Sequence, residues 1–583
     1  KNNLKNFPNE PALSIKGSSG EWETDNWSTF HESVIEVSKS LLACGINSQD
    51  KISIYSYNRK EWHYCYSAAQ YINAVGVGVY HTCSSNEVDW IVSNSESKIV
   101  FLGNNPNDND EELKMPNHRL LSVLDHLDKV ELVVALPGIK MLKHDKIISW
   151  DDFIKKGKDI EINEVESRFD EIKPEDTSAL IYTSGTTGNP KGVILTHDNW
   201  DFECQQILTV AKFKPGDRSI SWLPGAHVFG QAVDLHFTIR EGMHTYVVDS
   251  PLNTVDYAKE IQPHLFISVP RIYEKVYSNF KSAIDSKAIL KYGLHIPGLS
   301  TLLKKKLKAA AGFSNVTYAI SGAAPINPDI LTLFQFLGIP LFEGYGLTES
   351  TAGASLNYGL HNKIGSVGKL FPDTKAKIND DGEILLQGRH IMKGYYKNEK
   401  ASNESLVDGW FLTGDVGKID NDGFLYITGR KKEIYVSSAG KNIAPLVIEE
   451  TMKSIPIVSQ CFLVGDNRNY CTALFTLDVG AILRDKIGMD ATIIPKDPIK
   501  QLQTLKENGF ELVDFTNSDE IKKEMQDQVD ILNLKFSNPE QLKKFSILSR
   551  DFTIDDAELT PTLKIRRKQI SENWKKEIEL MYK

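Results

Sequence analysis

The sequence predicts an α/β fold: a large N-terminal domain of layered α/β subdomains plus a small antiparallel β-subdomain, followed by a small α+β C-terminal domain. Two observations predict it. Over residues 30–320, strand-like apolar runs alternate with helical stripes, an order typical of parallel sheets covered by helices. From Gly382 to Tyr435 the spacing shortens and Gly/Asp turns recur, which is typical of short antiparallel strands. The residues beyond mix helix and strand signals, including a polar helical stretch at 518–534.

Hydrophobic periodicity predicts the first elements. Residues Thr29 to Glu32 fit a capping box at the start of a helix that stops at Gly45. The next elements are expected in the order strand, helix, strand and strand, at residues 52–55, 61–74, 75–80 and 99–102. The polar, acidic stretch 104–112 predicts a surface loop.

Composition narrows the classes of function. The formal charge of −10 argues against a nucleic-acid-binding protein, which is normally basic. The six cysteines are scattered without a C-x-x-C pair, which argues against a zinc site or a disulfide framework and fits a reducing compartment. No apolar run is long enough to predict a membrane-spanning helix.

The strongest local signal is the segment from Tyr182 to Gly192, YTSGTTGNPKG, between two apolar strands. Its glycines let the backbone approach phosphate oxygens, and its successive amides can form an anion-binding nest. Hydroxyl donors and the charge of Lys191 add to this, but the pattern is not that of a P-loop NTPase. The segment predicts a phosphate-binding loop.

This segment resembles the phosphate loop of the adenylate-forming superfamily, which includes acyl-CoA synthetases, luciferases and peptide-synthetase adenylation domains. Further motifs follow in that family's order, so the resemblance covers nearly the whole chain. It implies that ATP is bound by the residues of this loop: Thr183, Ser184, Gly185, Thr186, Thr187, Gly188, Asn189, Pro190 and Lys191.

A second motif runs from Phe342 to Glu349, FEGYGLTE. Polar groups at the carboxyl end of a strand lie where open α/β sheets bind ligands. The resemblance implies that Tyr345 stacks on adenine, that Thr348 contacts the α-phosphate and acts in catalysis, and that Glu349, with Thr183, holds Mg²⁺. The nucleotide-binding set in this motif is Gly344, Tyr345, Gly346, Leu347, Thr348 and Glu349.

Three further motifs resemble the family's remaining nucleotide and hinge segments. The resemblance implies that Asp415 and Arg430 bind the ribose and that Lys564 is the catalytic lysine, although Thr562-Leu563 precedes it where many relatives have Ser-Gly. Lys432 falls at the hinge position, and Gly440 with Lys441 lies along the path of coenzyme A. The implied domains are an N-terminal domain 1–429, a hinge 430–434 and a mobile C-terminal domain 435–583.

A pocket for the acid is implied by two more segments. His227, in LPGAHVFG, matches a family position beside the carboxylate and is expected to act in catalysis. The small-residue run YAISGAAP resembles the wall of the acyl and adenine pocket. The expected acyl pocket is therefore His227, Ser321, Gly322, Ala323 and Gly344.

Within the superfamily, the chain is most similar to long-chain fatty acid–CoA ligases of the bubblegum type, through residues 270–275, 388–395 and the end after Lys564. This implies that ATP and a fatty acid form an acyl-adenylate and diphosphate, and that coenzyme A then gives acyl-CoA and AMP, with Mg²⁺ as cofactor. Two alternatives stay open: an acyl-AMP ligase with another acceptor, and a catalytically inactive lipid-binding relative. Val228-Phe229-Gly230 after His227 lacks the Asp usual in peptide-synthetase modules, and nothing indicates the oxygen chemistry of a luciferase.

The stretch from Tyr292 to Ala309 includes LLKKKLK, which predicts a basic amphipathic helix. Such a helix can lie on a membrane, or it can present a solvated face. The expected partners are small-molecule substrates and no nucleic acid. The expected location is cytoplasmic, with possible peripheral contact with an intracellular membrane.

Overall fold

The structure is a computed structural model of the chain, and it describes all residues except 105–114, 141, 184–188, 437–441, 467, 491–492, 555 and 561–563. It divides into two compact units. Unit 1 comprises residues 1–324, 331–377 and 385–412. Unit 2 comprises residues 325–330, 378–384 and 413–583.

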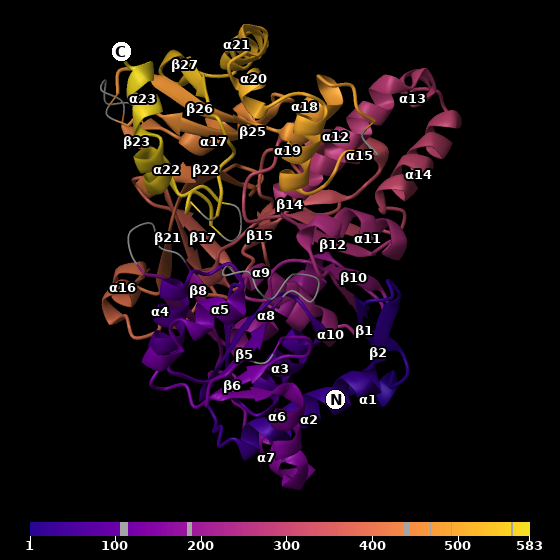
Figure 1. The fold of residues 1–583 in the computed structure, drawn as a ribbon, viewed down its shortest axis with the longest axis vertical. Helices are drawn as coiled ribbons and strands as arrows, with labels where there is room; N and C mark the ends of the chain where they lie inside the picture. Colours follow the sequence, from indigo (N-terminus) through magenta and orange to yellow (C-terminus); the bar gives the residue numbers. More distant parts are fainter. Residues whose placement is uncertain are drawn as a thin grey trace. The chain divides into compact units, whose positions relative to one another are not determined.

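One eight-stranded sheet of unit 1 carries the phosphate-loop segment (Figure 1). Its strand order is β19-β9-β8-β4-β3-β5-β6-β7, and the strands from β8 to β7 run parallel. Strands β9 and β19 are antiparallel additions at one edge. The strands are β3 (Lys51–Ser56), β4 (Val75–Val79), β5 (Ser97–Gly103), β6 (Leu132–Ala135), β7 (Ile147–Ser149), β8 (Thr177–Thr183), β9 (Lys191–Thr196) and β19 (Gly394–Tyr395).

A second, nine-stranded sheet of unit 1 has the order β16-β15-β14-β13-β12-β10-β11-β1-β2. It shares no strand with the first sheet, so unit 1 is built from two separate sheets. The strands are β1 (Pro11–Lys16), β2 (Trp22–Asn26), β10 (Arg218–Ser221), β11 (His244–Val247), β12 (Leu265–Ser268), β13 (Tyr318–Ser321), β14 (Leu341–Tyr345), β15 (Ser355–Leu356) and β16 (Lys369–Leu370).

The helices of unit 1 follow the predicted order, with one corrected start. Helix α2 (Trp27–Ala43) begins after Asn26, whose side chain accepts a hydrogen bond from the Thr29 amide. The predicted capping box at Thr29 is therefore wrong, because an Asn three residues earlier caps the helix. The other helices used below are α3 (Lys60–Tyr71), α4 (Ser85–Ser95), α8 (His197–Val210), α9 (Val228–Gly230), α11 (Thr254–Ile261), α12 (Pro270–Ser286) and α15 (Pro328–Leu337).

The single basic helix predicted at 292–309 is two helices in the structure. Helix α13 (Ala288–Gly293) ends before Pro297, and α14 (Leu299–Ala311) begins after Gly298, which has a φ of 82°. The Pro-Gly pair explains the break, since proline disfavours a helical residue before it and this glycine adopts a left-handed conformation. The acidic stretch expected as a loop at 104–112 lies, from residue 105 on, outside the described residues.

The chain passes from unit 1 to unit 2 in the region of short strands. Antiparallel pairs confirm the predicted β-subdomain. Strand β21 crosses the boundary between the units: its first residues pair with β20 in unit 1, and its later residues pair with β22 in unit 2. The strands of this region are β17 (Lys375–Ile378), β18 (Glu383–Gln387), β20 (Leu406–Val407), β21 (Trp410–Ile419) and β22 (Leu425–Arg430).

Unit 2 is an α+β body around the sheet β25-β26-β27. Because side chains alternate along a strand, Cys461 and Leu463 of β25 face one buried cluster, with helices α17 and α21, whereas Phe462 faces another with the C-terminal helices. The expected polar helix at 518–534 is α21, capped by Ser518. The elements are β25 (Val458–Val464), β26 (Cys471–Leu477), β27 (Leu542–Ile547), α17 (Pro445–Met452), α21 (Asp519–Asn533), α22 (Arg567–Asn573) and α23 (Lys575–Met581).

Over the described ranges, no helix is both long and apolar enough to cross a membrane. The predicted fold class is confirmed by the layered α/β unit 1, its short antiparallel strands and the α+β unit 2.

Candidate active site

The phosphate-loop segment joins two paired strands. Thr183 at the end of β8 is the register partner of Lys191 at the start of β9. Asn189 is exposed, and the Pro190 carbonyl accepts a hydrogen bond of 2.9 Å from the Trp90 indole of α4. Ser184, Gly185, Thr186, Thr187 and Gly188 lie outside the described residues. The hairpin thus holds a hydroxyl and an ammonium at the two ends of the segment.

Tyr395 of β19 connects this hairpin to the second motif. Its hydroxyl donates a 2.8 Å hydrogen bond to a carboxylate oxygen of Glu349, and the Lys191 ammonium lies 4.8 Å from the centre of its ring. The Met392 amide also donates to the Glu349 carbonyl at 2.8 Å. Tyr395 was not a predicted site residue, since a Gly-Tyr pair in an antiparallel edge strand carries no signal of its own.

The second motif follows the end of β14 as a tight turn. Residues Gly344 to Glu349 are all half-buried, and Thr348 and Glu349 lie in a single 3-10 turn. Gly346 is required by packing, because a Cβ there would lie 1.9 Å from the Ala352 carbonyl oxygen. The turn therefore presents Tyr345, Thr348 and Glu349 from one short segment at the end of a strand, as the sequence predicts.

These residues suit a magnesium ion. A carboxylate and a hydroxyl are oxygen ligands, and Mg²⁺ is usually held by one or two carboxylates together with substrate phosphates. Within the described part of the chain, no group of three or more His, Cys, Asp or Glu side chains is placed to hold a metal ion by itself. Glu349, at the edge of a phosphate-loop hairpin, fits an ion that is shared with a nucleotide.

Three segments predicted to form the acyl pocket lie together in unit 1. A Cβ on Gly322 would lie 3.3 Å from the Phe229 ring and 3.9 Å from the Gly344 carbonyl oxygen. Ser321 is fully buried, and its hydroxyl has no hydrogen-bond partner among the described residues. Ala323 has a φ of 68°, so the chain turns sharply after the buried strand end. Glycine lets these segments pack closely, because a Cβ on Gly344 would also lie 3.0 Å from the Leu356 side chain.

His227 lies at the N-terminus of α9, next to this wall. Its Nδ1 accepts a 3.2 Å hydrogen bond from the Phe229 amide, so a neutral ring carries its proton on Nε2. The side chain is half-buried. This geometry gives His227 a fixed orientation and an N–H donor on the nitrogen that Phe229 does not engage.

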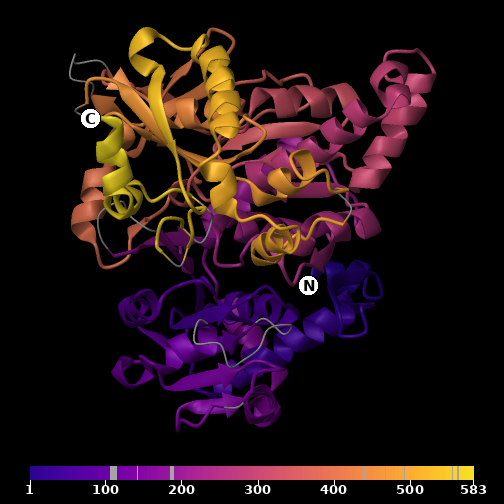
Figure 2. The same ribbon diagram turned by 45° about the horizontal axis from the view of Figure 1, so that its top comes forward.

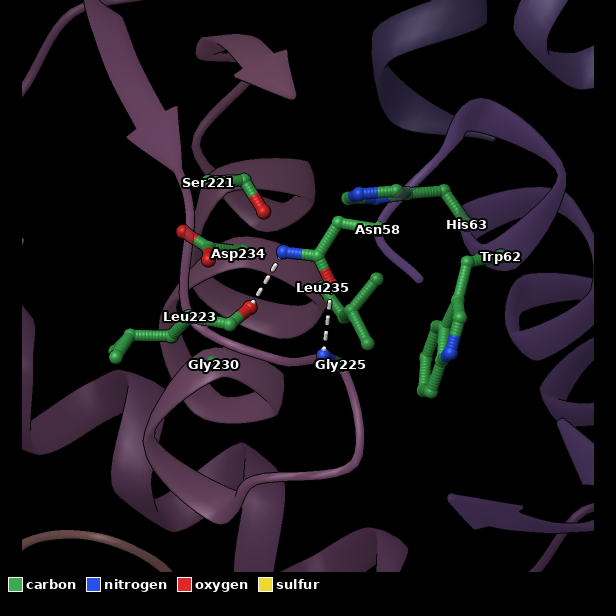
Figure 3. Close-up of a pocket in the computed structure, with 9 residues that line it drawn as sticks. All are labelled: Asn58, Trp62, His63, Ser221, Leu223, Gly225, Gly230, Asp234 and Leu235. Atoms are coloured by element: carbon green, nitrogen blue, oxygen red, sulfur yellow. Dashed lines mark hydrogen bonds between the residues drawn. The ribbon is translucent and has the colours of Figure 1, made fainter. Parts of the chain in front are cut away.

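Asn58 and Gln231 form a polar clamp on the loop that precedes His227, and Figure 3 shows the two hydrogen bonds of Asn58. The Asn58 side chain donates to the Leu223 carbonyl at 2.8 Å and accepts from the Gly225 amide at 3.1 Å. Gln231 donates to the Gly225 carbonyl at 2.9 Å. Gly225 also packs on Trp62, since a Cβ there would lie 2.7 Å from the indole ring. Neither Asn58 nor Gln231 was predicted, because only the folded chain brings Asn58 to this loop.

The small cavity next to this clamp contains two buried titratable groups, His63 and Asp234 (Figure 3). Burial lowers the pKa of His63 to about 4 and raises the pKa of Asp234 well above its usual range. Asp234 lies in a π-helical segment, Gln231–Phe237. Burial therefore favours the neutral form of both groups.

In unit 2, Asp415 and Arg430 form a pair across β21 and β22. They are register partners, and the Arg430 Nε donates to Asp415 at 3.0 Å. The Asp415 side chain is buried, whereas that of Arg430 is half exposed. Lys431 next to it contacts Asp381 at 2.5 Å and Glu383 at 2.9 Å, and these hydrogen bonds raise its pKa to about 12. Lys432 is exposed and lies in the 3-10 turn 431–433.

Lys564 is an exposed residue of unit 2. Its amide donates a 3.0 Å hydrogen bond to the Thr560 hydroxyl oxygen, and its carbonyl accepts one of 2.8 Å from the Thr560 amide. Three residues later, the half-buried Arg567 donates two hydrogen bonds to Glu449, of 2.8 and 2.5 Å, and one of 3.2 Å to Glu433. Arg567 thus ties the segment after Lys564 to α17 and to the turn that contains Lys432.

The predicted residues are divided between the two units. Unit 1 holds Thr183, Lys191, His227, the Ser321–Ala323 segment and the Gly344–Glu349 turn, and unit 2 holds Asp415, Arg430, Lys432 and Lys564. Gly440 and Lys441 lie outside the described residues.

Comparison with known proteins gives a consistent set of relatives. A family model described as AMP-binding enzyme matches residues 1–396. The long-chain-fatty-acid–CoA ligase FadD15 of Mycobacterium tuberculosis is 32% identical over 93% of this chain and 89% of its own. The human long-chain-fatty-acid–CoA ligase ACSBG2 is 30% identical over 99% of this chain and 91% of its own.

Solved structures share the fold at lower identity. O-succinylbenzoate coenzyme A synthetase of Bacillus subtilis, in complex with ATP and magnesium, has a TM-score of 0.68 at 20% identity, over 98% of both chains. The adenylation domain of a carboxylate reductase from Mycobacterium chelonae has a TM-score of 0.75 at 19% identity, over 99% of this chain and 90% of its own.

Proposed function

The chain belongs to the AMP-binding enzyme family, as its motifs predicted, and on that premise we propose that it is an ATP-dependent long-chain fatty acid–CoA ligase. The reaction joins ATP, a fatty acid and coenzyme A into acyl-CoA, AMP and diphosphate through an acyl-adenylate. The observation that carries this proposal is a named long-chain-fatty-acid–CoA ligase that is 32% identical over 93% of the chain.

In the first step, a carboxylate oxygen of the acid attacks the α-phosphorus of ATP. A new P–O bond forms, the bond to diphosphate breaks, and the electron pair leaves with diphosphate. Thr183, the 184–188 segment, Asn189, Pro190 and Lys191 hold the phosphates, while Tyr345 and its neighbours Gly344, Gly346 and Leu347 hold the adenine. Thr348 donates to the α-phosphate, and Lys564 bridges this phosphate and the incoming carboxylate. Positioning and charge stabilisation of this kind provide most of the catalysis in phosphoryl chemistry.

Magnesium, held by Glu349 and Thr183, would neutralise charge on the phosphates. The hydrogen bond from Tyr395 fixes the orientation of the Glu349 carboxylate, and the neighbouring Lys191 adds a positive charge at the same edge. Asp415 accepts hydrogen bonds from the ribose hydroxyls, and Arg430 holds Asp415 in place.

The acid lies against His227, Ser321, Gly322, Ala323 and Gly344. The close approach of Gly322 to the Phe229 ring places this wall beside the loop of His227, and the Nε2–H of His227 suits the carboxylate end. Each buried methylene contributes about 0.8 kcal/mol, so a long pocket favours long chains strongly but separates neighbouring lengths by only about fourfold.

In the second step, the thiolate of coenzyme A attacks the acyl carbonyl, the C–O bond to AMP breaks, and AMP leaves. We assign the segment 430–434, with Lys432, as the hinge between residues 1–429 and a mobile domain 435–583. Rotation about this hinge removes Lys564 and brings the segment of Gly440 and Lys441 to the acyl-adenylate. The exposed 3-10 turn at Lys432, with no buried residue, supports a hinge there.

The proposal includes a cytoplasmic location and peripheral contact with an intracellular membrane, because long-chain acids partition into lipid rather than water. It needs no nucleic acid partner.

Diphosphate release with Mg-ATP and palmitate, measured with and without coenzyme A, tests the function. Turnover that requires both palmitate and coenzyme A is expected. Release that does not depend on coenzyme A would indicate an acyl-AMP ligase with another acceptor. No release with any fatty acid would contradict the proposal and favour an inactive lipid-binding relative.

A further inference from the structure

Helices α13 and α14 carry a surface that the ligase reaction does not use. In Figures 1 and 2 the two helices project beyond the helices α11 and α12 on which they pack. Four large apolar side chains of this region are at least half exposed to solvent. They are Ile289 (62%), Tyr292 (66%), Ile296 (50%) and Leu302 (52%).

These side chains are not a poorly formed core. On α14 the buried face is made by Leu303, Leu307 and Ala311, which recur every four residues. Leu294, between the two helices, is also buried. The packing of both helices is therefore satisfied by other residues, and the exposed apolar groups face away from it.

The same surface is strongly basic. No Asp or Glu occurs in residues 286–328, although the whole chain has a formal charge of −10. The stretch contains six lysines, which are Lys287, Lys291, Lys304, Lys305, Lys306 and Lys308. We call these lysines and the four exposed apolar residues the α13–α14 surface.

The six lysines fall into two groups: two contact the neighbouring helix α15 or its end, and four are exposed. Lys304 lies 4.0 Å from the centre of the Phe336 ring, and Lys308 donates to the Gly338 carbonyl at 3.4 Å, so both are held against α15 and its end. Lys287, Lys291, Lys305 and Lys306 are exposed. Apolar groups surrounded by lysines, with Tyr292 among them, match the interface of a bilayer, where aromatic rings and lysine stems lie at the level of the headgroups.

We propose that the α13–α14 surface docks this enzyme on an anionic phospholipid membrane. Lysines near such a surface each add attraction, and the apolar residues enter the boundary between headgroups and acyl chains. The inference deepens the proposed function, since a membrane is where a long-chain acid is dissolved. Binding to the membrane itself needs no catalysis.

The test is flotation of the full chain with vesicles of phosphatidylcholine, with and without phosphatidylserine. Binding to the phosphatidylserine vesicles is expected, and it should fall as salt is raised. The triple variant Lys291→Glu, Lys305→Glu, Lys306→Glu should lower the partition coefficient about a hundredfold or more, since each lysine contributes about fivefold. The variant Ile289→Ser, Tyr292→Ser, Ile296→Ser should also weaken binding, with a smaller change in its salt dependence.

The matched control changes three exposed lysines of unit 2, as Lys500→Glu, Lys522→Glu and Lys523→Glu. It should bind as the unchanged chain does. Equal loss in the control, equal binding to vesicles without phosphatidylserine, or no binding at all would overturn the proposal. So would a surface variant that changes only the oligomeric state, because the occupant would then be a second copy of the chain. Turnover of palmitate dispersed in detergent should be unchanged in all three variants, so a failed ligase assay is distinguishable from a failed docking surface.

Discussion

The hydroxyl of Tyr395 lies 2.8 Å from a carboxylate oxygen of Glu349, and the ring of the same tyrosine lies 4.8 Å from the Lys191 ammonium. One side chain therefore connects a phosphate-loop lysine with the carboxylate proposed for magnesium. The two groups are far apart in the sequence, and the edge strand β19, paired with β9, places Tyr395 between them.

Tyr395→Phe should weaken the use of Mg-ATP. The ring beside Lys191 stays, but the hydrogen bond to Glu349 is lost, and a bond to a charged group contributes about 1.5–3 kcal/mol. We expect kcat/KM for ATP to fall by roughly ten- to a hundredfold and the Mg²⁺ concentration needed for half-maximal rate to rise. The control is Tyr396→Phe, whose hydroxyl contacts Glu96 at 3.4 Å instead. Equal kinetics for the two variants would contradict the role given to Tyr395.

Lys564→Ala should abolish adenylation while ATP still binds. A loss of even about 3 kcal/mol in the transition state lowers the rate roughly a hundredfold. Diphosphate release measures the first step, and the conversion of chemically prepared palmitoyl-AMP to palmitoyl-CoA measures the second, which should persist. Lys568→Ala, four residues away on α22 and exposed, should keep both steps. Diphosphate release by Lys564→Ala at the normal rate would refute the assignment.

Lys432→Pro should keep the first step and lose the second. Proline fixes φ near −65° and so restricts rotation at the proposed hinge. Lys432→Ala removes the same side chain but leaves the backbone free, so it should keep both steps. The two half-reactions are assayed as above. Equal loss of both steps in the proline variant would count against a hinge at this position.

Asp234→Asn should stabilise the protein more as pH rises. Burial raises the folded-state pKa of Asp234, so the folded chain favours the neutral carboxyl. The free energy of unfolding of the parent therefore falls as pH rises from the unfolded-state pKa of about 3.9 toward the folded-state pKa. The amide stays neutral at every pH. The difference in unfolding temperature between the variant and the parent should therefore widen from pH 5 to pH 8. Asp485→Asn, at a partly exposed side chain paired with Arg484, serves as control. A difference that is constant with pH would contradict a buried acid at this site.

Local signals carried the sequence-based prediction of the site. The residues of the phosphate-loop hairpin and of the Gly344–Glu349 turn lie in continuous segments, so their chemistry is visible in order along the chain. The fold class followed from alternating strands and helices. The start of α2 was misplaced because Asn26, and not Thr29, satisfies the first amides of the helix.

Contacts between segments that are distant in the sequence could not be predicted from local patterns. Asn58 lies between β3 and α3, far in sequence from the loop before His227 that it contacts. Tyr395 lies on the edge strand β19, far in sequence from Glu349. Neither residue has a local pattern, because an isolated Asn or Tyr has the same neighbours in many surface turns. The Pro297-Gly298 pair indicates the break between α13 and α14. The periodic leucines and lysines around it nevertheless led to the prediction of one continuous helix.

The most direct test of the central claim uses palmitate labelled with ¹⁸O in both carboxylate oxygens, together with Mg-ATP and coenzyme A. If a carboxylate oxygen attacks the α-phosphorus and the C–O bond then breaks, mass spectrometry should find one ¹⁸O in every AMP and one in the palmitoyl-CoA. Unlabelled AMP, or label in phosphate released together with ADP, would contradict an acyl-adenylate and with it the proposed function.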